Sequence, residues 1–334
     1  MKPELFSIKN HPFYTTLHHT KTGFTNIWSD NERASVMRAA GWIAGKMFDF
    51  RTALPLPLEK IDETQLLSVE DRLSIIWVGH STFIIKMQGV TILTDPVFSD
   101  RVSPVSFAGP KRISPLPWQI AELPKIDYVI ISHNHYDHLD TASIAELEKK
   151  FAPVFLVPLK IKETLKKAGA QKVVELDWWQ YIPFESDNKK LTFHCTPAKH
   201  FSGRGVADRD ETLWAGWYME YGQHKIYFAG DTAYSNHFQE IRQRLGAPTI
   251  AMLPIGAYQP RWFMRAVHVN PEEAVQAFID LSAKEFIAMH WGTFVLADED
   301  FMAPRKETLE AAEKHKINPD KIHILPIGGI FKSK

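Results

Sequence analysis

Three histidines and one aspartate lie within six consecutive positions of the segment ISHNHYDHLD, at His133, His135, Asp137 and His138. In an extended segment, residues two apart point the same way, so His133 and His135 can approach one ion together. A turn beyond them can bring Asp137 and His138 to a second ion. Neutral imidazole suits zinc and a carboxylate can ligate or bridge, so this cluster predicts a metal site.

Two ions need more ligands than this segment provides, and the ends of other apolar runs supply candidates. His200 stands in TPAKHFSG, Asp231 follows an apolar run in FAGDTAYS, and His290 precedes a glycine in IAMHWGT. A lone histidine of this kind is more often a satisfied polar residue than a ligand, but chance does not readily produce the whole set. The single cysteine, Cys195, argues against a thiolate cluster. A site with one ion, or with iron or manganese, stays open.

The segments that must position these residues alternate strands with helices. Two β-rich runs at 73–79 and 82–96 are broken by glycine and predict a hairpin. The near-continuous apolar run at 125–132 predicts a strand that is covered on both faces. Further strands are expected over 152–158, 190–198, 214–221, 225–231, 249–256 and 285–292, and amphipathic helices over 141–151, 161–170 and 270–283.

Helix-end signals support this assignment. Asn270 as N-cap, Pro271 at the first helical position and Glu273 three residues after the cap form a capping arrangement, and Gly169 is a plausible C-cap. Two β-rich halves that alternate with helices predict an α/β four-layer sandwich, with two packed sheets inside and helices outside.

Residues 1–70 are expected to form an N-terminal extension, and residues 71–334 the α/β domain. Apolar residues recur at helical spacing over 31–50, which predicts an amphipathic helix. This helix packs on or beside the domain, or it faces a membrane or a second subunit.

The composition excludes some functions. Lys+Arg and Asp+Glu are equal at 39 each, and no basic tract favours nucleic acid as a partner. We expect no secretory signal, and no apolar run reaches the roughly 18 residues of a membrane span. The single cysteine fits a reducing compartment. The chain is therefore expected to be cytoplasmic, either soluble or peripherally bound to a membrane.

The H-x-H-x-D-H motif at 133–138 resembles that of the metallo-β-lactamase superfamily. Further motifs at 79–87, 93–104, 122–140, 254–264 and 268–275 look like those of the N-acylphosphatidylethanolamine-hydrolysing phospholipase D family. This resemblance implies an αββα fold, two Zn2+ ions per chain, a phospholipid substrate at a membrane surface, and a homodimer. It also implies that His133, His135 and His200 hold one ion, that Asp137, His138 and His290 hold the other, and that Asp231 bridges them.

The implied reaction is attack on phosphorus by a metal-bridging hydroxide, which releases N-acylethanolamine and phosphatidic acid. Two zinc ions, the carboxylates of Asp137 and Asp231 and one hydroxide sum to about one positive charge, which favours an anionic phosphodiester. A lactonase or a soluble phosphodiesterase on the same scaffold is the alternative. A non-catalytic lipid- or nucleic-acid-binding protein is a third, which the complete ligand set opposes.

Other residues are candidates for contacts around the ions. Asp95 could hold the second N–H of a ligating histidine, or it caps a turn. His80 lines the site or caps the hairpin, and His268 is a catalytic candidate that faces the substrate, or it supports a helix start. Arg261 pairs with phosphate or with a structural carboxylate.

Aromatic residues are candidates for the substrate pocket. The hydroxyl of Tyr136 contacts phosphate or its ring forms a wall, and Tyr258 is a weaker candidate of the same kind. Acyl chains need an apolar cavity. Its wall is expected to include Trp178, Trp179, Phe201, Trp262, Phe263 and Met264, unless these belong to the ordinary core.

Overall fold

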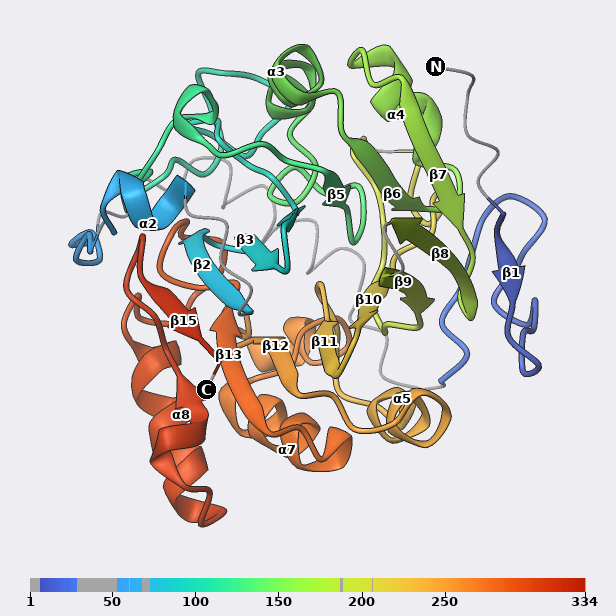
Figure 1. The fold of residues 1–334 in the computed structure, drawn as a ribbon. Helices are drawn as coiled ribbons and strands as arrows, with labels where there is room; N and C mark the ends of the chain where they lie inside the picture. The colour runs from blue at the N-terminus through green and yellow to red at the C-terminus, as the bar shows by residue number, and fades with distance from the viewer. Residues whose placement is uncertain are drawn as a thin grey trace.

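The computed structural model of the chain shows two β-sheets packed face to face, with helices on their outer faces (Figure 1). This is the four-layer α/β sandwich that the sequence predicts. The helix expected over 31–50 lies outside the described residues. The structure describes residues 7–28, 53–59, 61–67, 73–186, 189–205 and 207–333.

The first sheet has the strand order β15-β2-β3-β4-β5-β6-β7. Antiparallel pairing joins β2, β3 and β4, as the predicted hairpin requires, whereas β4 to β7 run parallel. The strand expected over 125–132 is shorter in the structure, because only the three residues of β5, 128–130, pair with β4. The strands are β2 (Ser74–Gly79), β3 (Thr82–Met87), β4 (Val90–Thr94), β5 (Tyr128–Ile130), β6 (Val154–Pro158), β7 (Lys172–Leu176) and β15 (Ile330–Lys332).

The second sheet has the order β1-β8-β9-β10-β11-β12-β13-β14. It is antiparallel from β1 to β11 and parallel from β11 to β14. Its strands are β1 (Lys9–Asn10), β8 (Gln180–Ser186), β9 (Lys189–Thr196), β10 (Gly216–Tyr221), β11 (His224–Phe228), β12 (Ile250–Pro254), β13 (Glu285–Met289) and β14 (Ile322–His323).

Helices cover the outer faces of both sheets. In Figure 1, α3 and α4 lie outside the first sheet, and α5, α7 and α8 lie outside the second. Among the described residues, no helix combines the length and apolar character that a bilayer span requires. The helices are α2 (Glu63–Leu67), α3 (Thr141–Phe151), α4 (Lys162–Lys167), α5 (His237–Leu245), α6 (Arg261–Met264), α7 (Pro271–Leu281) and α8 (Ala303–Lys314).

The caps explain where the helices begin and end. The predicted capping box of α7 is present, since Asn270 accepts from the Glu273 amide and Glu273 accepts from the Asn270 amide. Helix α3 spans the predicted residues, and its N-cap, Asp140, lies two residues after the motif at 133–138. The C-cap of α4 is Ala168, and Gly169 follows it with a φ of +104°, a conformation that favours glycine.

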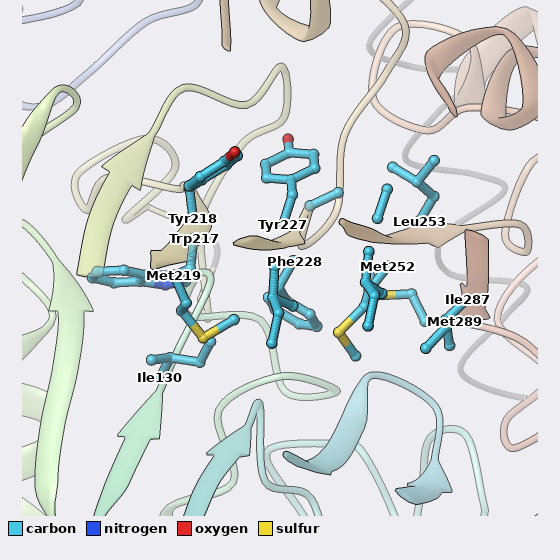
Figure 2. Close-up of a cluster of buried hydrophobic side chains, with 14 of the residues drawn as sticks. Ile130, Trp217, Tyr218, Met219, Tyr227, Phe228, Met252, Leu253, Ile287 and Met289 are labelled. Atoms are coloured by element: carbon cyan, nitrogen blue, oxygen red, sulfur yellow. The ribbon is translucent and has the colours of Figure 1, made fainter. Parts of the chain in front are cut away.

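The core between the sheets comes from alternating side chains on β10 to β13. Figure 2 shows Trp217, Met219 and Phe228 on the side facing Ile130 of β5, while Tyr218 and Tyr227 point the other way. All five are fully buried, which stabilises the fold by about 1.5–3 kcal/mol for a side chain of this size. The Trp217 indole also donates to the carbonyl of Ile131 at 2.8 Å, a direct link between the two sheets.

Candidate metal centre

The seven predicted ligands meet at one end of the sandwich, where strands of both sheets end. The loop that holds His133, His135, Asp137 and His138 follows β5 of the first sheet. The other three follow strands of the second sheet: His200 comes after β9, Asp231 after β11, and His290 directly after β13. The two halves of the sandwich therefore each contribute part of one centre.

A first group consists of three imidazoles. His133 Nε2 lies 2.7 Å from His135 Nδ1, and His200 Nε2 lies 3.3 Å from the same atom. Ligands of a tetrahedral zinc ion stand roughly 3.4 Å apart, given Zn–N bonds of about 2.1 Å. The three nitrogens are thus close to the spacing that one ion requires.

A second group is centred on the carboxylate of Asp137. Its Oδ2 lies 3.3 Å from His138 Nε2 and 3.4 Å from His290 Nε2. His80, from the turn between β2 and β3, adds its Nε2 at 3.0 Å from the same oxygen. The sequence left two roles open for His80, lining the site or capping the hairpin, and the structure places it beside the centre.

Asp231 lies between the two groups. Its Oδ2 is 3.1 Å from His138 Nε2 and 3.1 Å from His290 Nε2, and it is 3.9 Å from His133 Nε2 and 3.8 Å from His200 Nε2. One carboxylate oxygen is therefore within reach of both groups, as a bridging ligand must be.

Buried polar atoms without a hydrogen bond show that the residues fit a metal ion. His138 Nε2, His290 Nε2, Asp231 Oδ1 and His268 Nδ1 are buried, and none has a hydrogen-bond partner. Such atoms are costly unless something satisfies them. The donor set is nitrogen and oxygen with no sulfur, because the sole cysteine is buried in β9. It suits a divalent ion.

The pKa values separate the histidines into two kinds. Burial lowers the pKa of His135 to about 4 and that of His200 to about 3, and it also holds the pKa of His133 well below its ordinary value. These imidazoles are neutral at pH 7 and have a free lone pair. For His290, burial lowers the pKa, but Asp231 and Asp137 outweigh it and raise the value to about 9.

The two carboxylates remain ionised. Burial raises the pKa of Asp137 and of Asp231, but the neighbouring histidines, His138 and His290 among them, together outweigh burial, and both pKa values lie well below the ordinary range. The centre thus concentrates negative charge that a cation must balance. Burial lowers the pKa of His138, but Asp231 and Asp137 outweigh it and hold the value well above the ordinary range, so a proton on His138 can balance part of this negative charge.

Asp95 fixes the orientation of His138. Its carboxylate accepts from His138 Nδ1 at 2.7 Å, from the Ser132 hydroxyl at 2.6 Å and from the Ser132 amide at 2.7 Å. Ser132 stands directly before the motif, but nothing in the sequence distinguished it. Asp95, His80 and His290 all have positive φ, of 32°, 53° and 60°, so three non-glycine residues at the centre are strained.

His268 faces the centre from the loop before α7. Its ring lies 5.0 Å from that of His200 and 5.4 Å from that of His290, measured between centroids. The preceding carbonyl, of Val267, accepts from His200 Nδ1 at 2.8 Å. This contact leaves His200 Nε2 as the ligating atom.

Two of the candidates for substrate contact, Arg261 and Tyr136, have protein partners instead. Arg261 makes two hydrogen bonds to the Glu273 carboxylate and donates to the His268 carbonyl at 3.0 Å. Of the two partners that the sequence left open for Arg261, phosphate or a structural carboxylate, the structure shows the carboxylate. The Tyr136 hydroxyl donates to the carbonyl of Arg204. Tyr258 is buried, and burial together with Glu307 raises the pKa of its hydroxyl.

The predicted aromatic wall is wrong for two of its members. Trp178 and Trp179 are core residues that pack against the N-terminal segment, with Trp178 stacked on His18 and Trp179 edge-on to Phe13. Phe201 does lie at the centre, with its ring 4.5 Å from that of His135. Trp262, Phe263 and Met264 belong to α6 and are not among the residues that line the cavity at His80 and His290.

A cavity of about 730 Å³ opens from the centre. Its lining includes His80 and His290, and most of the rest comes from two segments, 53–57 and 291–302, that are mainly apolar but include Asp298, Glu299 and Asp300. Leu54 and Met302, with exposed fractions of 88% and 44%, stand on its lining. The sequence analysis did not identify either segment as a cavity wall, because most of their residues lie outside the predicted helices and strands.

Known proteins resemble this chain in sequence and in fold. Residues 90–291 match the Beta-lactamase superfamily domain. N-acyl-phosphatidylethanolamine-hydrolyzing phospholipase D 1 of Caenorhabditis elegans is 38% identical over 272 residues, which cover 78% of this chain and 76% of that protein. The mitochondrial enzyme of the same name from Saccharomyces cerevisiae is 38% identical over 78% of this chain but only 57% of its own length.

A solved structure, a possible metal-dependent hydrolase from Veillonella parvula, has the same fold with a TM-score of 0.62 at 17% identity. It matches 78% of this chain and all of that one.

Proposed function

This chain belongs to the beta-lactamase superfamily and, within it, to the N-acyl-phosphatidylethanolamine-hydrolysing phospholipases D; on that premise we propose that this metal-dependent hydrolase cleaves N-acylphosphatidylethanolamine. The products are N-acylethanolamine and phosphatidic acid, and the cofactor is a pair of Zn2+ ions. The observation that carries the proposal is the junction of a buried His/Asp centre with an apolar cavity at His80 and His290.

The centre would hold one ion with His133, His135 and His200, and a second with Asp137, His138 and His290, both sharing Asp231. Zinc ions in such a pair lower the pKa of water to about 7 and stabilise charge on phosphoryl oxygens. The chain itself sets the geometry. Asp95 orients His138, the Val267 carbonyl orients His200, and His80 holds Asp137.

We assign to His268 the contact with the reacting group of the substrate. His268 is buried, its Nδ1 has no hydrogen-bond partner, and its ring is near those of both His200 and His290. Burial lowers its pKa to about 3, so the imidazole is neutral at pH 7 and can donate or accept one hydrogen bond. It is suited to a phosphoryl oxygen or to the oxygen of the leaving group.

The cavity fits the lipid part of this substrate. A volume of about 730 Å³ is within the usual range for ligand sites, and its walls carry Leu56, Phe294 and Phe301. Exposed Leu54 and Met302 on its lining would contact the acyl region of a bilayer, so we assign this face to peripheral membrane binding. The homodimer stays a prediction.

The test compares substrates on purified protein whose bound metals have been quantified. N-acylphosphatidylethanolamine in mixed micelles is compared with a soluble phosphodiester and a lactone, and products are identified by mass spectrometry. We expect N-acylethanolamine and phosphatidic acid in equal amounts, and a much slower reaction on both soluble compounds. Preference for the lactone or the soluble diester would refute the lipid assignment in favour of the alternative hydrolases.

A further inference from the structure

The described N-terminal residues 7–28 form an arm that lies along the second sheet, next to β8 (Figure 1). Strand β1 of the arm pairs with β8, and the His11 amide donates to the Trp179 carbonyl at 3.0 Å. The arm is distant in sequence from every candidate ligand. Its far end nevertheless reaches the loop that holds His200.

Asp177, at the end of β7, anchors the middle of the arm. Its buried carboxylate accepts from His18 Nε2 at 2.6 Å, from His19 Nε2 at 2.8 Å and from the Tyr14 hydroxyl at 2.8 Å. His18 is fully buried against the ring of Trp178. These contacts fix the position at which the next turn of the arm begins.

That turn packs on the loop between β9 and β10. The Phe24 amide donates to the Asp210 carbonyl at 2.8 Å, and a Cβ at position 23 would lie 1.9 Å from the same oxygen. Only glycine allows the two backbones to approach this closely. The Asp210 carboxylate in turn accepts from the amide of Ser202, which stands two residues after His200.

Asn26 is the point where the arm meets the metal centre. Its Nδ2 donates to the His200 carbonyl at 2.8 Å, and its Oδ1 accepts from the His200 amide at 3.2 Å. One carboxamide thus satisfies both backbone groups of a candidate ligand. The described residues between Thr196 and Gly216 include no helix or strand, so His200 lies outside the ladders of hydrogen bonds that hold the strands.

We propose that Asn26 is a positioning residue for the first metal group, acting through the backbone of His200. The Val267 carbonyl sets the rotation of the His200 ring, and Asn26 sets the position of the His200 backbone from which that side chain extends. Together they direct His200 Nε2 toward His135. The proposal rests on the proposed metal centre, and it makes the N-terminal arm part of the site.

The test is metal affinity, measured without substrate. Full-length wild-type, Asn26→Ala and Asn26→Asp proteins are titrated with Zn2+ against a chelator, and their Co2+ forms are compared by visible absorption. Substitutions beside metal ligands typically cost about 10–100-fold in affinity. We expect a loss of about tenfold or more for one of two ions, and a changed Co2+ spectrum, in both variants.

Asn10→Ala is the matched control. Asn10 is an exposed asparagine of the same arm that accepts from the Gln180 side chain and touches no candidate ligand. Asn26→Asp preserves the shape of the side chain and the acceptor for the His200 amide but loses the donor to the His200 carbonyl. It therefore tests the pair of hydrogen bonds to the His200 backbone even where Asn26→Ala folds poorly. Wild-type affinity for both ions in the two Asn26 variants would overturn the proposal, as would an equal loss in Asn10→Ala. Because no lipid is present, this result is separate from the identity of the substrate.

Discussion

The carboxylate of Asp95 lies 2.7 Å from Nδ1 of His138, and both side chains are completely buried. Burial alone would raise the pKa of this carboxyl group, and the hydrogen bonds from His138 and Ser132 oppose that rise. A partner of this kind makes the other nitrogen of a histidine a stronger ligand.

Asp95→Ala is therefore expected to weaken metal binding by about 10–100-fold, with the loss at the ion held by His138. Chelator competition measures it. Asp127→Asn is the control, because Asp127 pairs with exposed Lys125 on another part of the surface. Equal affinities in wild-type and Asp95→Ala proteins would show that the contact does not support the ligand.

Asp137→Asn and His290→Ala are each expected to reduce turnover by at least roughly 10²–10³-fold, since each removes a group that would stabilise charge in the transition state. Both residues stand at the end of the sandwich and outside the main core. Circular dichroism should therefore remain close to that of the wild-type protein. Full activity in either variant would remove the two-metal mechanism.

Leu54→Glu tests the membrane face. Leu54 is 88% exposed on the lining of the cavity, and insertion of a leucine side chain contributes about 1.5 kcal/mol or more. We expect roughly tenfold weaker partitioning to phospholipid vesicles in flotation assays, with unchanged hydrolysis of a small soluble diester.

Leu17→Glu is the control for that variant, because Leu17 is 75% exposed on the N-terminal arm and does not line the cavity. Membrane binding that falls equally in both variants would mean that the cavity face has no special role.

Glu220 on β10 gives the fold a pH dependence. Its carboxylate accepts from His194 at 2.8 Å and pairs with Lys225 at 3.0 Å, and these contacts lower its pKa from 4.5 to about 2. A lowered carboxyl pKa stabilises the folded state above pH 4.5, and this stabilisation is lost as the pH falls toward 2.

Glu220→Gln should therefore lower the free energy of unfolding by about 1 kcal/mol at pH 7, a modest value because the side chain is about a third exposed. Urea titrations at several pH values measure this difference. It should shrink steadily below pH 4.5. A difference that is the same at pH 3 and pH 7 would contradict the assignment to the ionised carboxylate.

Local signals in the sequence predicted many of the elements. Apolar runs predicted β2 to β6 and β9 to β13, and the cap at Asn270 predicted the start of α7, because these patterns depend on neighbouring residues only. The expectations did not include β1, β7, β8, β14, β15, α5 or α8. The convergence of His200, Asp231 and His290 on the 133–138 loop was also predictable, since each follows an apolar strand.

The environment of the centre was harder to predict, because it depends on contacts between distant segments. Trp178 and Trp179 are as apolar as any pocket wall, and only the docking of the N-terminal arm on them makes them core. Arg261 finds Glu273 twelve residues away in a geometry that no spacing rule specifies. Asn26 acts on a residue 174 positions away.

The core between the sheets has a consequence for catalysis. The 133–138 loop belongs to one sheet, and His200, Asp231 and His290 belong to the other, so the thickness of the packed layer sets how far apart the two sets of donor atoms stand. Trp217 and Met219 facing Ile130 help to fix that thickness. Because each group takes donors from both sheets, a substitution that changes the volume of this layer would alter the spacing of the donor atoms within each group, although every candidate ligand stayed the same.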